Sequence, residues 1–322
     1  METIQPGKPA RLGSLGTTAA PARASGSEPS TTPRPVRDLL AVSLEGKAAH
    51  QERHLDVTDE ASLARLRNGS PDDRQLARTI EQARSSYRTL LDAGARIVVG
   101  RSAGNGHMPA VTIIPKALLD HPDQAFEAVV HYGGMYGTAA RPDPNGGLPA
   151  RIRDRMAQLP PAVIVLCEAR NHGSFPTREP YSPDWSLASD PEQVAADALR
   201  HQGLSGDRTL TVSAHSAGGR AIARIITEGR LACDRLELQD CLYANGNKIS
   251  SGKAVLAWAG SPEGQRCREI VYIHAAHGQN SEHHLLRAGQ ILAGGQAVTR
   301  VELVRHYDAA FWAAPAAAGR LR

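Results

Sequence analysis

The stretch from Leu210 to Arg220 reads LTVSAHSAGGR, and it passes from an apolar strand-like segment through small residues into a helical one. A serine on so tight a strand-to-helix turn is forced outward at the carboxyl edge of a sheet. Its neighbours must be small because strand and helix approach closely, and Gly218 and Gly219 meet that need. The pattern predicts a nucleophile elbow that exposes Ser216 and directs the backbone amide of Ala217 toward an oxyanion. A plain glycine-rich turn is the alternative.

Short apolar runs alternate with helical stretches on both sides of this turn. Runs rich in Val, Ile and Leu that alternate with helical patterns are typical of a largely parallel sheet covered on both faces. The predicted strands are Ala95–Gly100, Ala110–Pro115, Phe126–His131, Ala162–Glu168, Thr209–Ser213, Arg235–Leu238, Arg268–His274 and Val298–Val304. The predicted helices are Leu148–Gln158, Pro191–His201, Gly218–Glu228 and Ser281–Ala293. We therefore expect an α/β fold with a mostly parallel central sheet of about eight strands and helices on both faces.

The composition divides the chain into three regions. Residues 1–36 contain six prolines and two acidic residues, and such a segment buries too little apolar surface to offset its ordering entropy. We expect a disordered tail there, a helical lead-in over 37–92 that packs on the core, and the α/β domain over 93–322. The first two strands of that domain have a short link and are expected to pair antiparallel at an edge.

The best-marked helix of the lead-in begins with a capping signal. Ser70 can cap the helix, Pro71 suits its first position, and two aspartates follow where the helix dipole favours negative charge. The helical pattern continues to Leu91, and Gly94 then supplies a left-handed stop. We interpret its apolar face as ordinary packing against the sheet.

A second glycine-rich turn follows the predicted strand that ends at His131. It reads HYGGMYG over residues 131–137 and is of the kind that lipases and esterases use as an oxyanion loop. Because glycines leave backbone N–H groups uncovered, Gly133 and Gly134 are candidates to donate hydrogen bonds opposite Ala217. A phosphate-binding loop is disfavoured because no G-x-x-x-x-G-K-[ST] string is present. A simple turn is again the alternative.

A serine nucleophile needs a base of near-neutral pKa and a carboxylate that orients it. His306 lies just after the last predicted strand, where its side chain would reach the sheet edge. Asp240 follows the strand next to the elbow and is the first choice of carboxylate, with Glu282 as the alternative. The alternatives without a catalytic role are a surface histidine for His306 and a turn-capping aspartate for Asp240. A histidine cluster after the strand Arg268–His274 is a weaker source of the base.

These residues resemble the α/β-hydrolase superfamily. The resemblance is strongest to bacterial serine hydrolases whose elbow reads like S-H-S-G-G and whose next strand ends like L-D-A-L-Y-G. The corresponding stretches here read AHSAGG from Ala214 and QDCLYA from Gln239. The alanine that opens the elbow and the incomplete H-G-G-G run depart from the commonest form. The resemblance covers residues from about 94 to 315.

What the resemblance implies is a serine hydrolase of the esterase, lipase or amidase kind that acts on a small-molecule or acyl substrate. In that interpretation Ser216 is the nucleophile, His306 the base and Asp240 the orienting acid, with oxyanion donors at Ala217 and near Gly133 and Gly134. Water releases the acyl group, and no cofactor or metal is required. An acyltransferase with the same triad is a related alternative.

Composition and charge exclude several other classes. Aromatic residues make up 4% of the chain, and the net charge of +4 is spread rather than concentrated, so nucleic-acid binding gains no support. No apolar run approaches the length of a membrane-spanning helix, and no apolar segment typical of a secretory signal follows Met1. The cysteines show no C-x-x-C pair, so we expect four reduced thiols and no metal site.

The tail supports one competing function. Ser/Thr/Pro-rich, acid-poor N-termini resemble type III secretion signals of bacterial effectors and organellar transit peptides, and composition does not separate these. We therefore expect either a cytoplasmic protein or one secreted by a type III-like route. In the second case the fold would bind a host partner, and the serine would be dispensable.

Overall fold

The computed structural model describes residues 54–101, 109–133, 148–167, 170–171, 183–184, 190–242, 251–275 and 295–303. The chain divides into the units Met1–Ala49 and His50–Arg322, and all described residues belong to the second. Several predictions therefore lie outside the described residues: the tail, the helix over 281–293, and the site residues Gly134, Glu282 and His306.

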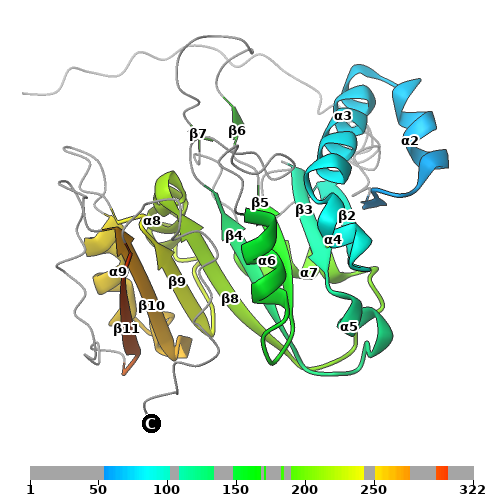
Figure 1. The fold of residues 1–322 in the computed structure, drawn as a ribbon. Helices are drawn as coiled ribbons and strands as arrows, with labels where there is room; N and C mark the ends of the chain where they lie inside the picture. The colour runs from blue at the N-terminus through cyan, green and yellow to red at the C-terminus, as the bar shows by residue number, and fades with distance from the viewer. Residues whose placement is uncertain are drawn as a thin grey trace, which may run out of the picture. The chain divides into compact units, whose positions relative to one another are not determined.

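One large sheet organises the described residues (Figure 1). Its strands are β1 (Leu55–Asp56), β2 (Arg96–Arg101), β3 (Pro109–Ile114), β4 (Phe126–Tyr132), β5 (Ala162–Cys167), β8 (Arg208–His215), β9 (Arg235–Gln239), β10 (Glu269–Ala275) and β11 (Ala297–Leu303). All eight predicted strands are present with bounds within two residues of those expected, and β1 adds a ninth. A separate antiparallel pair is formed by β6 (Arg170–Asn171) and β7 (Pro183–Asp184).

The sheet has the order β1-β2-β3-β5-β4-β8-β9-β10-β11. β3 is antiparallel to both of its neighbours, β2 and β5, which confirms the predicted antiparallel pairing of the first two predicted strands. From β5 to β11 every adjacent pair is parallel. A reversed second strand, an exchange in order of the next two strands and a parallel remainder, once β1 is set aside, are the arrangement of the α/β-hydrolase fold. The predicted fold class is confirmed.

Helices lie on both faces of the sheet. They are α2 (Glu60–Arg67), α3 (Pro71–Ser86), α4 (Arg88–Asp92), α5 (Lys116–Asp120), α6 (Leu148–Met156), α7 (Pro191–Leu199), α8 (Gly219–Thr227) and α9 (Ser251–Ala259), with single 3-10 turns η2 (Ser216–Gly218) and η3 (Gly264–Arg266). Of the helices predicted in the α/β domain, the three that fall in the described ranges correspond to α6, α7 and α8. None of the helices in these ranges is both long and apolar enough to cross a bilayer.

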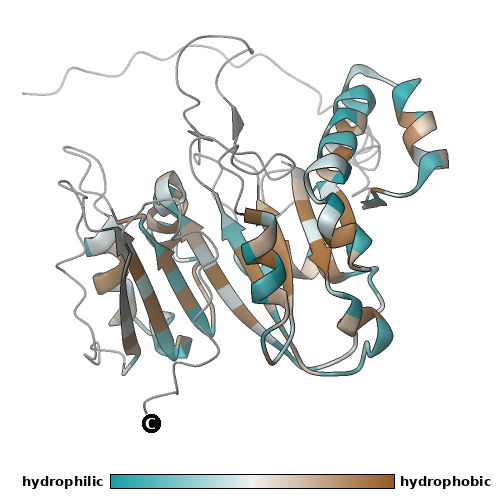
Figure 2. Cartoon of the chain, in the orientation of Figure 1, coloured by the Kyte–Doolittle hydropathy of each residue, from teal (hydrophilic) through white to brown (hydrophobic). Residues whose placement is uncertain are grey.

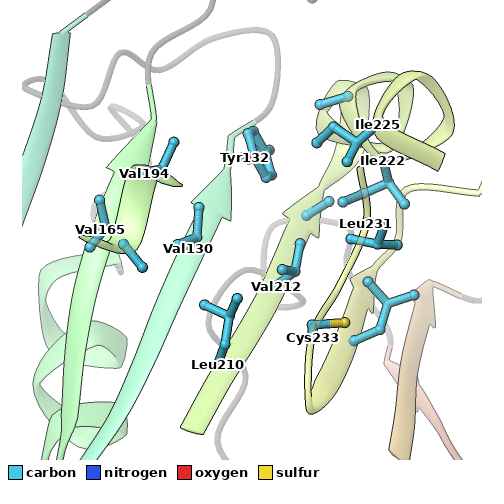
Figure 3. Close-up of a cluster of buried hydrophobic side chains, with 14 of the residues drawn as sticks. Val130, Tyr132, Val165, Val194, Leu210, Val212, Ile222, Ile225, Leu231 and Cys233 are labelled. Carbon is cyan, nitrogen blue, oxygen red and sulfur yellow. The ribbon is translucent and has the colours of Figure 1, made fainter. Parts of the chain in front are cut away.

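Two hydrophobic clusters hold the helices against the sheet. On one face, side chains of β4, β5 and β8 meet those of α7 and α8, and Figure 3 shows Val130, Val212 and Ile222 in this cluster. On the other face, α3, α4 and α6 cover the strands from β2 to β5, where Ile97 and Ile164 are fully buried. β5 reads as a continuous apolar run because both of its faces are buried, whereas β4, β8 and β9 carry polar residues at alternate positions on one face.

The lead-in helix begins as predicted and ends earlier than expected. The Ser70 side chain accepts a hydrogen bond from the Asp73 amide, and the Asp73 carboxylate accepts one from the Ser70 amide, so the cap is reciprocal. The helix ends at Ser86 because Tyr87, with φ −106° and ψ 22°, leaves the helical conformation before α4 begins. Gly94 has φ +86° and forms the expected left-handed stop.

Candidate active site

Ser216 occupies a strained turn between β8 and α8. Its φ is +51°, a left-handed value that non-glycine residues adopt at a cost of about 1–3 kcal/mol and keep mainly at functional sites. Its neighbours His215 and Ala217 are buried, whereas Ser216 itself is partly exposed. The described part of the chain thus contains the sharp strand-to-helix turn that the sequence predicted.

Two glycines allow this turn to pack closely between the backbone at the ends of β4 and β9. A Cβ atom on Gly218 would come within 2.1 Å of the Tyr132 carbonyl oxygen, at the end of β4. A Cβ atom on Gly219 would come within 1.9 Å of the Cys241 carbonyl oxygen, just after β9. The elbow is therefore enclosed by the segments that follow the strands on either side of β8, and no side chain fits at these two positions.

Asp240 leaves the sheet beside Ser216. His215 pairs with Gln239 in the parallel register of β8 and β9, so the serine and the aspartate are the next residues of neighbouring strands. Asp240 also has a left-handed φ, +46°, and Ser216 and Asp240 are the two non-glycine residues with positive φ among those described. The Asp240 amide donates a hydrogen bond to the Ile273 carbonyl at 2.6 Å, and the residue is 4% exposed.

The two described oxyanion candidates lie next to the elbow. Ala217 is the middle residue of the turn η2 that leads into α8, and it is buried. Gly133 follows β4, and its carbonyl oxygen would lie 3.1 Å from a Cβ atom on Gly218. A Cβ atom on Gly133 itself would meet no atom within 4 Å, so the space next to its Cα atom is unfilled. Backbone amides of the β4 and β8 segments therefore reach the same edge of the sheet.

The structure brings together four of the six predicted site residues, namely Ser216, Asp240, Gly133 and Ala217. Gly134 and His306 lie outside the described residues, as does Glu282, and their roles stay predictions. β11 ends at Leu303, which pairs with Ala275 at the carboxyl end of β10. The described chain thus ends at the edge that carries the elbow, three positions before His306.

Polar side chains line one face of the sheet directly beneath this edge. His131 of β4 pairs in register with Ser213 of β8, and its Nδ1 atom lies 3.0 Å from the Ser213 Oγ. Burial lowers the pKa of His131 to about 3, and the nearby His215 contributes to the same effect. The His131 imidazole is therefore neutral at neutral pH. Figure 2 shows β8 and β9 banded, with hydrophilic and hydrophobic residues in alternation.

A buried ion cluster lies deeper on the same face. Nη2 of Arg155, on α6, is 2.8 Å from Oε1 of Glu127 on β4 and 2.9 Å from Oε1 of Glu237 on β9. Thr211 of β8 donates a hydrogen bond to Glu127, and Gln239 donates one to Glu237 at 3.2 Å. One guanidinium group therefore joins β4 and β9, the strands on either side of β8, and Thr211 links β8 to the same cluster through Glu127.

Sequence reasoning missed this cluster. Its signal in the sequence is a glutamate on one face of each of two strands whose other face is apolar, because a buried carboxylate implies a partner. The identity of that partner has no local signal, since Arg155 is 82 residues from Glu237. Among the described residues, no group of three or more His, Cys, Asp or Glu side chains could hold a metal ion. The four cysteines are free and buried, which confirms the predicted thiols.

No protein-family model and no curated protein matches the sequence. Among solved structures, an S-formylglutathione hydrolase from Staphylococcus aureus aligns with a TM-score of 0.43 at 12% identity over 68% of this chain and 91% of that one. Esterases from Rhizomucor miehei give 0.40 at 15% over 79% and 90%. A Bacillus subtilis carboxylesterase gives 0.39 at 10% over 73% and 93%. We base the fold class on the strand order and directions alone.

Proposed function

We propose that this protein is a serine hydrolase that cleaves an ester or an amide through an acyl-enzyme intermediate. Ser216 is the nucleophile, Asp240 the orienting carboxylate and His306 the general base. The backbone amides of Ala217 and of the Gly133–Gly134 turn hold the oxyanion. No cofactor or metal takes part in this mechanism.

The observation that carries the proposal is the pair of left-handed residues at the carboxyl edge of the sheet. Ser216 and Asp240 follow paired positions of adjacent strands, and both keep a backbone conformation that costs free energy. A structural turn could use glycine at either position without that cost. A serine and an aspartate at these positions are what a nucleophile and its orienting acid require.

The chemistry follows from this placement. The Ser216 hydroxyl attacks the substrate carbonyl carbon while the imidazole of His306 takes its proton. The tetrahedral oxyanion accepts hydrogen bonds from the amides of the two turns, and the imidazolium then protonates the leaving group. His306 then takes a proton from a water molecule, which attacks the carbonyl carbon of the acyl-enzyme. The imidazolium returns a proton to the Ser216 oxygen as the acid product leaves. Asp240 stabilises the imidazolium during both steps.

Hydrolysis of chromogenic esters and anilides of graded chain length tests the proposal. We expect turnover of at least one series by the wild type, and a loss of at least roughly a thousandfold in kcat/KM in Ser216→Ala. Ser205→Ala changes an exposed loop serine and should leave turnover unchanged. No turnover of any substrate, or equal turnover by wild type and Ser216→Ala, would contradict the proposal.

Amide substitutions test the third member of the triad. Asp240→Asn keeps a residue type that tolerates left-handed φ and should lower kcat by on the order of 10³–10⁴-fold. Glu282→Gln should leave kcat close to that of the wild type. The reverse pattern would assign the orienting role to Glu282. Product analysis with added alcohol or amine shows whether the acyl group passes to an acceptor other than water.

A further inference from the structure

Two of the four buried cysteines lie level with each other where β9 and β10 begin. The parallel register of these strands pairs Arg235 with Glu269, and two residues earlier it sets Cys233 opposite Cys267. Paired residues of neighbouring strands are about 4.8 Å apart and direct their side chains to the same face of the sheet. A disulfide requires Cα atoms about 4.4–6.8 Å apart. The register therefore places the two cysteines within the separation that a disulfide bridges.

The contacts around the pair extend this register to the cysteines. The Arg268 amide donates a hydrogen bond to the Asp234 carbonyl oxygen at 2.9 Å, one position before the paired strands begin. The Cys233 thiol forms a hydrogen bond with the Cys267 sulfur, so the two side chains face each other. The Cys267 thiol also donates a hydrogen bond to the Glu269 carbonyl oxygen at 3.2 Å. The two sulfur atoms are thus in hydrogen-bond contact in the reduced protein.

The other two cysteines are too far apart to pair. Cys167 ends β5 and Cys241 follows β9, so both lie at the carboxyl edge of the parallel strands, whereas Cys233 and Cys267 lie at the amino edge. β4 and β8 lie between β5 and β9, which puts Cys167 and Cys241 roughly 14 Å apart. A disulfide that included either of them would require the sheet to open. Of the four cysteines, Cys233 and Cys267 are therefore the pair that can join in the folded protein.

The two thiols of this pair differ in acidity. The hydrogen bond from Cys233 lowers the pKa of Cys267, and the same bond together with burial raises the pKa of Cys233 well above its ordinary value. Cys267 therefore ionises first, and the thiolate is the form that attacks an oxidant. Cys267 directly follows the turn η3 and lies between the exposed residues Arg266 and Arg268. Figure 3 shows Cys233 among the side chains of the hydrophobic cluster.

We propose that Cys233 and Cys267 are a redox-modification site, at which hydrogen peroxide converts the two thiols into a disulfide that fastens β9 to β10 and a thiol reductant restores them. The Cys267 sulfur takes one hydroxyl group from the peroxide and becomes a sulfenic acid, and the other leaves with the thiol proton as water. The Cys233 sulfur then attacks the sulfenic sulfur, and its proton leaves with the hydroxyl group as a second water. The two sulfurs lose two electrons in total, which the peroxide takes up.

The disulfide should act on the stability of the fold. It would close the chain between residues 233 and 267, a segment that includes β9, α9 and η3, and so restrict the unfolded state. The oxidised protein should therefore unfold at a higher urea concentration than the reduced protein. Because the pair lies at the edge of the sheet opposite Ser216, the inference does not depend on the proposed function.

Peptide mapping of the folded full-length protein tests the proposal. The protein is treated with dilute hydrogen peroxide, then unfolded, and its remaining thiols are alkylated. A glutamate-specific protease releases residues 229–237 and 264–269, which contain the two cysteines. Mass spectrometry without reduction should find these peptides linked, with the loss of two hydrogen atoms, while Cys167 and Cys241 are alkylated. Dithiothreitol added before alkylation should remove the link.

Alanine variants assign the two steps. Cys233→Ala and Cys267→Ala should each abolish the link, and Cys241→Ala, the matched control, should retain it. Dimedone, which traps sulfenic acids, should label Cys267 in peroxide-treated Cys233→Ala, because the thiol that would displace the hydroxyl group is gone. In urea titrations, oxidation should raise the midpoint of the wild type and should not raise that of Cys233→Ala.

Three results overturn the inference. They are alkylation of all four cysteines in the peroxide-treated wild type, a link that includes Cys167 or Cys241, and a link that forms in urea but not in the folded protein. An oxidised wild type no more resistant to urea than the reduced one overturns the role in stability. The mapping needs the wild type alone, so a variant that fails to fold leaves it decisive. Turnover by Ser216 enters none of these measurements, and the failure of either proposal leaves the other intact.

Discussion

Ser216 and Asp240 hold backbone conformations that their side chains disfavour, and the chain keeps them at the two positions where the proposed reaction needs a hydroxyl and a carboxylate. Local strain of this kind is expected to trade stability against function. The trade can be measured at Ser216 because its neighbours are buried and fix the turn.

Replacement of Ser216 should therefore abolish activity, while its effect on stability should depend on whether the new residue tolerates the left-handed backbone. Glycine adopts φ +51° without steric cost, so Ser216→Gly should be more stable to urea unfolding than Ser216→Ala by about 1 kcal/mol. Both variants should lack hydrolytic activity. Equal stability of the two variants would show that the turn relaxes and that no strain is held there.

The close approach of Gly219 to the Cys241 carbonyl group leads to a second prediction. Gly219→Ala would place a Cβ atom 1.9 Å from the Cys241 carbonyl oxygen, and we expect a loss of about 3 kcal/mol or more in the free energy of unfolding. Gly133→Ala is the matched control, because a Cβ atom there meets nothing within 4 Å and should cost less than about 1 kcal/mol. Urea titrations of both variants measure these losses. A free energy of unfolding for Gly219→Ala close to that of the wild type would contradict the close packing of the elbow.

Helix α3 shows how a local signal fixes an element. The Ser70–Asp73 capping box is reciprocal, so Ser70→Ala should lower the free energy of unfolding by about 1 kcal/mol. Ser85→Ala, at an exposed position inside the same helix, should be neutral or slightly stabilising. Neither change should alter turnover. A destabilisation by Ser85→Ala as large as that by Ser70→Ala would argue against the cap.

Elements with strong local signals could be predicted from the sequence, and those held by distant contacts could not. β5 is apolar throughout because helices cover both of its faces, whereas β4 and β8 are apolar on the face covered by α7 and α8 and carry buried polar residues on the other. Helix α9 was missed because its alanine-rich run over Ser251–Ala259 has only a short apolar face, of which Val255 and Trp258 are the large members. Neither the short β1 nor the pair β6 and β7 has an apolar run long enough to recognise.

The same distinction holds for the candidate site. Ser216 and Asp240 could be predicted because each follows a strand directly in a turn of small or polar residues. The base had to be chosen among 13 histidines without a comparable local signal. The ion cluster could not be predicted, because it joins α6 to strands far from it in the sequence.

For the molecule as a whole, we expect the buried His131 to cause a loss of stability in acid. Its pKa is about 3 in the folded protein, against 6.5 for a free histidine, so the unfolded chain binds a proton that the native state excludes. The stability contributed by the neutral imidazole is complete above pH 6.5 and declines as the pH falls toward 3. The slope from this group is at most about 1.4 kcal/mol per pH unit.

Urea unfolding between pH 7.5 and about pH 4.5 measures this linkage. The free energy of unfolding should fall more steeply with acid in the wild type than in His131→Gln, which retains a group able to bond with Ser213 and does not titrate. Parallel curves for the two proteins would show that His131 takes up its proton without unfolding.

Covalent labelling detects whether the turn after β8 presents a reactive hydroxyl. The protein is treated with a fluorophosphonate probe, digested, and the modified residue is located by tandem mass spectrometry. We expect one adduct, on Ser216, that is absent from Ser216→Ala and from His306→Ala. No adduct in the folded wild type, or an adduct on another residue that persists in Ser216→Ala, would contradict it.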